Sequence, residues 1–243
     1  MLLKHYIICG IAVLLGFAGG FLLANALNRS GMDRLDSGLK SSSGQGKTTE
    51  KPGNLDLAES EIREKLSQAA NDPENFPLQK GLGLALYQFA ALKQDEKRLD
   101  DVEVLLQRAY ALNPDDYEVL VAFGSINIDL AKIQKDPLKI KKARGIFAKA
   151  LEKNPKDVRV LNTLASTYLA GDDPDPDRAI IYLNDAMSAD KRNEAALLNL
   201  ASAYLAKGNT AKAREYVSKL KELNRSNPEI IRIEGKIQME EAR

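Results

Sequence analysis

The stretch that decides the fold is ARGIFAKALEKNP, residues 143–155. Its small and apolar positions, Ala143, Phe147 and Ala150, are four and three residues apart, and Pro155 follows five residues later. The same steps recur in AIIYLNDAMSADK, residues 179–191. Two packed helices require such a pattern, because small side chains must lie where their backbones cross and large ones must fill the space beside them. The stretch therefore predicts repeated pairs of packed helices.

An apolar residue followed at once by a small one precedes each stretch. Phe123 and Gly124 precede the first, and Leu164 and Ala165 precede the second. Extended in both directions, the pattern gives four units, residues 75–114, 115–155, 156–191 and 192–225, and Leu82 and Gly83 form the apolar–small pair of the first. It resembles the tetratricopeptide repeat family, whose helix-turn-helix unit of about 34 residues has an apolar–small pair in its first helix and a final proline. The resemblance implies a right-handed solenoid of helix pairs that binds other proteins.

The first two units are longer than the family unit. The distance from Pro73 to Pro114 equals that from Pro114 to Pro155, 41 residues in each case. The excess is roughly two helical turns, so we interpret it as longer helices that pack side by side. Two unrelated loop insertions are the alternative. Asp136 and Pro137 favour longer helices, because they supply an N-cap and a first-turn proline for a long second helix.

Two further helices are expected at the ends of the array. One lies within residues 56–74, around Ile62, and the other within residues 226–243, around Ile230. Such helices cover the apolar face that a terminal repeat would otherwise expose to water. No stretch alternates between apolar and polar residues as a half-buried strand would. We therefore expect an all-α fold.

A different kind of segment precedes the repeats. Residues 6–27 contain 22 residues without a charge, which as a helix would extend about 33 Å, against about 30 Å for the hydrocarbon core of a bilayer. We interpret the segment as one transmembrane helix, a signal anchor behind the short tail 1–5. A cleaved signal peptide is the alternative, because Ala24, Asn25 and Ala26 form a small-x-small cleavage site.

Small residues recur at every fourth position of this apolar segment. They are Ala12, Gly16, Gly20 and Ala24. On one face of a helix they would let a second helix approach closely, which predicts self-association within the membrane. The alternative is that glycine and alanine are simply common in membrane helices.

The charges that flank the apolar segment bear on the side of the membrane that the repeats face. Lys4 precedes the segment and five basic residues follow it before the repeats, which by the positive-inside rule places the repeats in the cytoplasm. A very short tail before an apolar run is also how signal anchors export the domain behind them. We favour the extracytoplasmic, periplasmic side, with the cytoplasmic side as the alternative. Residues 28–55, rich in Ser, Gly, Lys and Thr, are expected to form a flexible linker.

Catalytic chemistry lacks the residues that it needs. The only histidine is His5 and the only cysteine is Cys9, so no Ser/His/Asp, Cys/His or zinc cluster can form among the repeats. Gly46–Thr48 resembles the end of a phosphate-binding loop, but Ser41 stands where that loop needs a glycine. We therefore predict no enzyme, no metal site and no cofactor.

Charge gives a weaker signal. The net charge is only +1 and aromatic residues are few, which is unlike a nucleic-acid-binding protein. Residues 132–144 contain six basic residues and one acidic residue, Asp136. Such a patch could bind anionic lipid headgroups or an acidic partner, or be a solvated face. Asp173, Asp175 and Asp177 alternate as in a calcium loop, but the closing glutamate is missing, so we interpret them as a turn that caps the next helix.

In the tetratricopeptide repeat family, the first helix of each unit lines a concave groove that accepts an extended or helical peptide. Carried over by position, the resemblance implies ten groove-lining residues: Lys80, Leu84, Glu118, Val121, Ser125, Arg159, Asn162, Ser166, Leu198 and Ser202. They do not reproduce the basic and asparagine set with which some family members hold a terminal carboxylate.

These features together predict a membrane-anchored scaffold whose groove binds a protein or peptide partner in the assembly of an envelope protein complex. Docking would raise the partner's effective concentration at the bilayer. The alternative is a structural protein that self-assembles through its repeats and its transmembrane helix. The adaptor would stay monomeric as a purified repeat domain, whereas the structural protein would grow with concentration.

Overall fold

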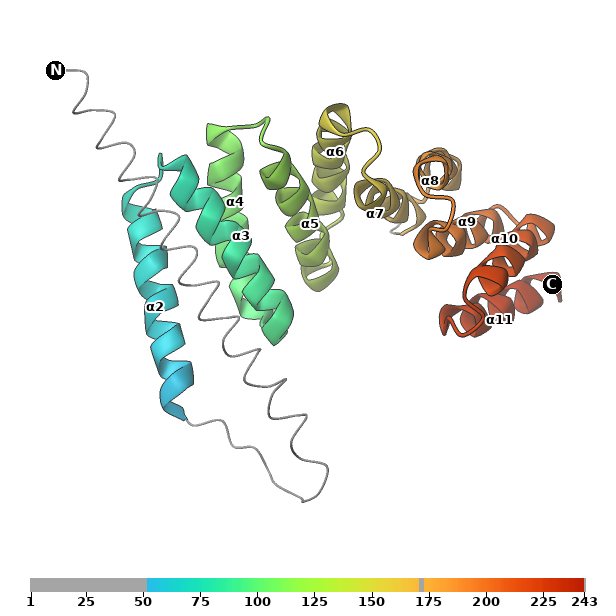
Figure 1. Cartoon of the computed structure of the whole chain (residues 1–243), viewed down its shortest axis with the longest axis horizontal. Coiled ribbons are helices and arrows are strands. Elements are labelled where there is room, and N and C mark those ends of the chain that lie inside the picture. The colour runs from blue at the N-terminus through green and yellow to red at the C-terminus, as the bar shows by residue number, and fades with distance from the viewer. Residues whose placement is uncertain (1–51, 171–172, 243) are drawn as a thin grey trace. The chain divides into compact units, whose positions relative to one another are not determined.

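In the computed structural model, the structure describes residues 52–170 and 173–242. All regular elements in these ranges are helical, ten α-helices and one 3-10 turn (Figure 1), which confirms the predicted all-α class. They form two compact units that divide within one helix, unit 1 ending at Ala122 and unit 2 beginning at Phe123. The expected tail, transmembrane helix and most of the linker lie outside the described residues, as do Ala12, Gly16, Gly20 and Ala24. Within the described ranges, no helix combines the length and apolarity needed to span a membrane.

Unit 1 contains three complete α-helices, a 3-10 turn and the start of a fourth helix. These are α2 (Pro52–Asn71), α3 (Phe76–Lys93), η1 (Glu96–Arg98), α4 (Leu99–Leu112) and the first residues of α5 (Tyr117–Gln134). Helix α2 begins inside the stretch expected as linker, because a proline such as Pro52 is tolerated in a first helical turn. It contributes Ile62 and Ala69 to the core.

The crossing of α3 and α4 depends on a residue without a side chain. A Cβ at Gly83 would lie 2.9 Å from Cδ2 of Leu106 and 3.3 Å from Cβ of Leu105. Leu105 and Leu106 are fully buried, and the neighbouring Leu82 is 6% exposed. The apolar–small pair Leu82 and Gly83 therefore packs as the sequence pattern predicts.

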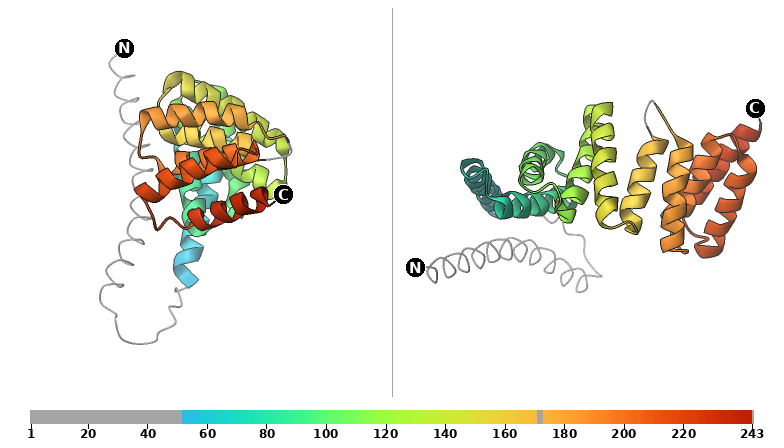
Figure 2. Two further views of the ribbon diagram at one scale, coloured as in Figure 1. Left: turned by 90° about the vertical axis from the view of Figure 1, so that its right-hand side faces the viewer. Right: turned by 90° about the horizontal axis from the view of Figure 1, so that it is seen from above.

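Unit 2 contains the rest of α5 and six further helices. These are α6 (Pro137–Lys153), α7 (Val158–Leu169), α8 (Pro176–Ala189), α9 (Glu194–Ala206), α10 (Thr210–Leu223) and α11 (Glu229–Glu241). Each helix from α7 onward packs against the next, and α7 also contacts α9 (Figures 1 and 2). Helices α5 and α6 have 18 and 17 residues, against 12 to 14 in α7 to α10. This difference supports the interpretation that the excess residues of the second unit lengthen its helices.

Phe147 fills the space where α5 and α6 cross. A Cβ at Gly124 would lie 2.8 Å from Cε1 and Cζ of the Phe147 ring, and the ring itself is 1% exposed. The side chain of Asp136 accepts a hydrogen bond from the Leu138 N–H at 2.9 Å, with Pro137 as the first helical residue. Helix α6, which contains most of residues 143–155, therefore begins and packs as its residues predict.

Helix α11 covers the last repeat. Ile230, Ile233 and Ile237 are buried in one cluster with Val217 and Leu220 of α10. Leu220 occupies a position where the repeat pattern expects a small residue, and its side chain is completely buried. The larger side chain is accommodated because the isoleucines of α11 pack around it.

Candidate binding surface

In unit 1, two of the predicted groove residues bind each other. Nζ of Lys80 lies 2.8 Å from Oδ2 of Asp116 and 2.7 Å from Oε2 of Glu118. Asp116 also accepts a hydrogen bond from the Val119 N–H at 3.0 Å and so caps α5. The ammonium group of Lys80 is therefore engaged within the fold, and its pairing neutralises much of the local charge.

Burial and hydrogen bonding shift the pKa values of Lys80 and Asp116 in opposite directions. Desolvation by itself lowers the pKa of Lys80, but hydrogen bonds to Asp116 and Glu118 outweigh it and leave the pKa above its usual value. Desolvation raises the pKa of Asp116, and the Lys80 and Val119 hydrogen bonds outweigh it, so that this pKa lies below its usual value. Both groups are therefore held in their charged forms at neutral pH. Of the other two candidates in unit 1, Leu84 is half-buried and Val121 is buried.

In unit 2, three predicted residues share one face of α7. Arg159 and Ser166 are exposed, and Asn162 between them is 9% exposed. The hydroxyl of Ser166 donates to the Thr163 carbonyl at 2.7 Å. The face therefore presents the exposed Arg159 guanidinium and the Ser166 hydroxyl on either side of a buried amide.

Asn162 is committed to the fold. Its Nδ2 donates to the Val158 carbonyl at 2.9 Å and to Oδ1 of Asn193, the cap of α9, at 3.0 Å. Its Oδ1 is buried without a hydrogen-bond partner among the described residues. Asn162 therefore positions α9 against α7 rather than presenting a free side chain.

The α9 candidates continue the same surface. Leu198 and Ser202 are half-buried, and the Ser202 hydroxyl donates to the Leu198 carbonyl at 3.0 Å. Helices α7 and α9 contact each other, and Leu198 packs at the edge of the buried cluster that α9 forms with α10 and α11. We call the set the α7–α9 surface; it consists of Arg159, Asn162, Ser166, Leu198 and Ser202. Ser125, the remaining candidate in unit 2, is half-buried on α5.

Sequence reasoning missed the carboxylate that joins α9 to the turn between α10 and α11. Glu194 accepts hydrogen bonds from Nδ2 of Asn224 at 2.9 Å and from Nδ2 of Asn227 at 2.8 Å. The available signal was the recurrence of asparagine before helices, since Asn193, Asn209 and Asn227 each accept a hydrogen bond from a following N–H. Such residues hold the starts of the helices that follow them.

Stacked tyrosines join the two helices of each C-terminal repeat. The rings of Tyr168 and Tyr182 are 5.9 Å apart and inclined by 14°, and those of Tyr204 and Tyr216 are 5.5 Å apart and inclined by 8°. Burial is the main cause that raises the pKa of Tyr182 and of Tyr216. The Arg144 guanidinium lies 4.2 Å from the centre of the Tyr168 ring. These contacts are structural, because each ring packs against its partner.

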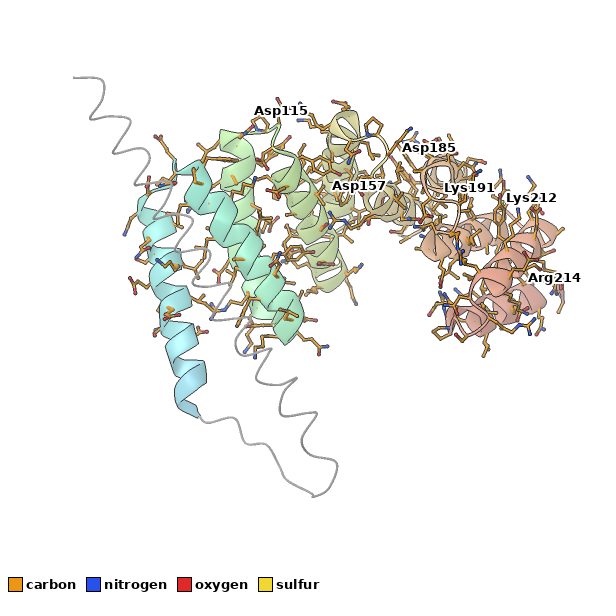
Figure 3. All side chains as sticks on the ribbon, in the orientation of Figure 1. Asp115, Asp157, Asp185, Lys191, Lys212 and Arg214 are labelled. Carbon is orange, nitrogen blue, oxygen red and sulfur yellow. The ribbon has the colours of Figure 1, made fainter. Side chains whose placement is uncertain are left out.

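An open hollow lies beside the turn between α8 and α9. Its volume is about 470 Å³, and its lining combines Met187, Leu197 and Leu223 with Lys191 and Arg192. Lys191 stands in that turn, where the repeat pattern expects a proline (Figure 3). The hollow shares no lining residue with the α7–α9 surface. It was not predicted from the sequence.

The chemistry available on these surfaces is that of recognition. Among the described residues, no group of three His, Cys, Asp or Glu side chains could hold a metal ion. The α7–α9 surface offers one guanidinium, two hydroxyls and one aliphatic side chain. Such a mixture can contact both the backbone and the side chains of a bound peptide.

Comparisons with known proteins agree with this description. Residues 172–237 match the tetratricopeptide repeat family model. No curated protein sequence matches the chain. A solved structure of a tetratricopeptide repeat protein from Parabacteroides merdae is similar, with a TM-score of 0.61 and 14% identity over 90% of this chain and 73% of that one.

Two further solved structures match this chain over most of their own lengths. YrrB, described as a protein of this repeat class with an unusual peptide-binding site, has a TM-score of 0.59 and 16% identity over 75% of this chain and 88% of its own. MamA has a TM-score of 0.56 and 19% identity over 73% of this chain and 97% of its own. At these identities the likeness shows the fold alone. The described helices therefore have the tetratricopeptide repeat fold, and residues 172–237 match the repeat family itself.

Proposed function

We propose that the chain is a membrane-anchored scaffold that binds a protein or peptide partner on the α7–α9 surface. The observation that carries the proposal is the arrangement of Arg159, Ser166 and Leu198. They lie on two contacting helices, and the partly buried hydrogen bond from Asn162 to Asn193 links those helices. A surface fixed in this way loses little conformational freedom when a ligand binds.

Two further observations support the proposal. The fold is that of a class of proteins that use stacked helix pairs as binding surfaces, and YrrB has a peptide-binding site on a similar fold. The uncharged residues 6–27 are long enough to cross a bilayer as a helix. Together they favour a scaffold held at the membrane. The short tail 1–5 ahead of the apolar segment favours the periplasmic side for the repeats, where the scaffold would help to assemble an envelope protein complex.

Photocrosslinking in cells tests the binding role. A photoreactive amino acid placed at Ser166 of the full chain is expected to give a discrete adduct with one partner. The matched control is Ala148, which is exposed on α6. Equal adducts from both positions, or none from Ser166, would contradict the proposal. Cleavage of residues 28–51 by protease added outside intact cells tests the periplasmic side, and protection would place the repeats in the cytoplasm.

A second candidate function is self-assembly into a structural polymer. The observation that favours it is that Ile231 and Met239 on the terminal helix α11 are 80% and 72% exposed. A growing polymer would cover such residues at each end-to-end contact. Light scattering of the detergent-solubilised full chain distinguishes the two, because a scaffold keeps a constant mass as its concentration rises and a polymer does not.

A further inference from the structure

The turn between α5 and α6 brings exposed apolar side chains together with positive charge. Leu138, in the first turn of α6, is 72% exposed, and Ile133, in the last turn of α5, is 46% exposed. Residues 132–144 contain six basic residues and one acidic residue. Only Lys135 and Asp136 separate α5 from α6, and the two helices form a helical hairpin (Figure 1). Leu138 and Ile133 are therefore residues of the connected end of that hairpin.

The fold uses some of these charges and leaves others facing water. Arg144 donates to Oγ1 of Thr167 at 3.2 Å, and Asp136 is occupied in capping α6. Lys135 and Lys141 are exposed, and neither makes an ion pair or side-chain hydrogen bond within the described part of the chain. Their ammonium groups are therefore available to an external anion.

The exposed apolar residues are not needed to pack the hairpin. Helix α6 buries its opposite positions, Ala143, Ile146 and Phe147. A single exposed leucine needs no explanation. An exposed leucine and isoleucine within a run of lysines form the pattern of a membrane-surface contact, in which apolar side chains enter the headgroup region and lysines attract anionic lipids.

The neighbouring hairpin has the opposite charge. The turn that leads into α8 carries Asp173, Asp175 and Asp177, and Ile181 on α8 is 61% exposed. An anionic surface would repel this turn although an apolar side chain is exposed beside it. Of these two hairpins, only the one at the α5–α6 turn therefore combines exposed apolar side chains with positive charge.

We propose that residues 133–142 dock on an anionic lipid surface. Leu138 and Ile133 enter the headgroup region, and Lys135 and Lys141 contact lipid phosphates. The contact fixes which side of unit 2 faces the bilayer. It is independent of partner binding on the α7–α9 surface, so either proposal can fail without the other.

A single tryptophan tests the contact directly, because the chain contains none. Full chain carrying Leu138→Trp is reconstituted in phosphatidylcholine vesicles with or without phosphatidylglycerol. We expect a blue-shifted emission that brominated acyl chains quench, only when phosphatidylglycerol is present. The matched control Ile181→Trp keeps its emission in both. Adding Lys135→Gln and Lys141→Gln to Leu138→Trp is expected to lower the ratio of docked to free turns roughly 30-fold.

Three results would overturn the proposal. They are unchanged emission of Leu138→Trp on anionic vesicles, an equal change on neutral vesicles, and an equal change in the Ile181→Trp control. A shift caused by polyglutamate in detergent, without vesicles, would assign the turn to an acidic protein instead. Circular dichroism of each variant verifies that the helices are retained.

Discussion

Nδ2 of Asn162 on α7 lies 3.0 Å from Oδ1 of Asn193, the residue that caps α9. The same oxygen accepts a hydrogen bond from the Ala196 N–H at 2.7 Å. In unit 1, Lys80 on α3 reaches Asp116, the cap of α5, in a similar way at 2.8 Å. A side chain on the first helix of a repeat thus holds the start of the next first helix. This contact fixes the spacing of helices along each unit.

Replacing Asn162 tests how much this contact contributes. Asn162→Ala removes two hydrogen bonds from a buried site and leaves Asn193 with one fewer donor, so we expect the free energy of unfolding to fall by about 1–2 kcal/mol. Ser166→Ala on the same face is the control and should change it by less than about 0.5 kcal/mol. Urea unfolding followed by circular dichroism measures both. Equal effects would mean that the Asn162 contact is not stabilising.

Two glycines in unit 2 should respond to alanine with opposite signs. Gly124→Ala places a Cβ 2.8 Å from the buried Phe147 ring, so we expect a loss of about 1–3 kcal/mol. Gly145→Ala on α6 meets nothing within 4 Å and should stabilise the helix by about 0.5–1 kcal/mol. The measurement is the urea midpoint of each variant. An unchanged urea midpoint for Gly124→Ala would show that the helix crossing does not require glycine.

The Asp116 carboxylate predicts a loss of stability in acid. Its pKa is lowered in the folded chain, because the Lys80 and Val119 hydrogen bonds outweigh burial. Its contribution is therefore complete above the unfolded pKa of about 3.9 and disappears as the pH falls through the folded value. The pKa of Lys80 is raised in the folded chain. Its contribution to stability is therefore complete below the unfolded pKa of about 10.4 and is lost as the pH rises through the folded value. Between these limits the contribution of the pair should be constant.

Asp116→Asn measures this contribution, because asparagine keeps an oxygen that can accept the Val119 N–H. We expect the free energy of unfolding of the wild type to exceed that of the variant by up to about 1 kcal/mol between pH 6 and pH 8. The difference should shrink toward pH 2. In a Lys80→Met background it should be smaller at neutral pH. A difference that grows in acid would contradict the assigned pKa direction.

Arg144 should stabilise the junction between α6 and α7. Its guanidinium hydrogen-bonds the Thr167 hydroxyl and carbonyl and lies over the Tyr168 ring. Arg144→Ala is therefore expected to cost about 1–3 kcal/mol in thermal or urea unfolding. Lys141→Ala, from an exposed position of the same helix, should be close to neutral. Similar losses in both variants would point to a general effect of charge on α6.

Short-range steric rules explain why the helix pairs could be predicted from sequence. Gly83 and Gly124 were expected at crossings because the pattern requires small residues there, and the space beside each is filled by Leu106 or Phe147. Asp136 was expected to cap α6 because capping depends on a few neighbouring residues. The family resemblance rests on the same local pattern, which residues 172–237 also match at the level of the family model.

The binding surface was harder to predict, because periodicity identifies the helix face but not the partner of each side chain. Lys80 and Glu118, which the resemblance places along a groove, pair with each other. Asn162 lies on the expected face, and its amide reaches a residue of the next repeat. Such contacts depend on how far apart the repeats lie, which the sequence pattern does not specify. The lining of the groove and the repeat boundaries remain predictions.

Partner binding on the α7–α9 surface can be tested by a competition across its two helices. The photocrosslinked adduct formed from position Ser166 on α7 is measured in full chain that also carries Leu198→Glu on α9. We predict that the adduct falls at least tenfold, whereas Ala148→Glu on α6 leaves it unchanged, with matching thermal unfolding in all three proteins. An adduct that survives Leu198→Glu at full yield would contradict partner binding on this surface.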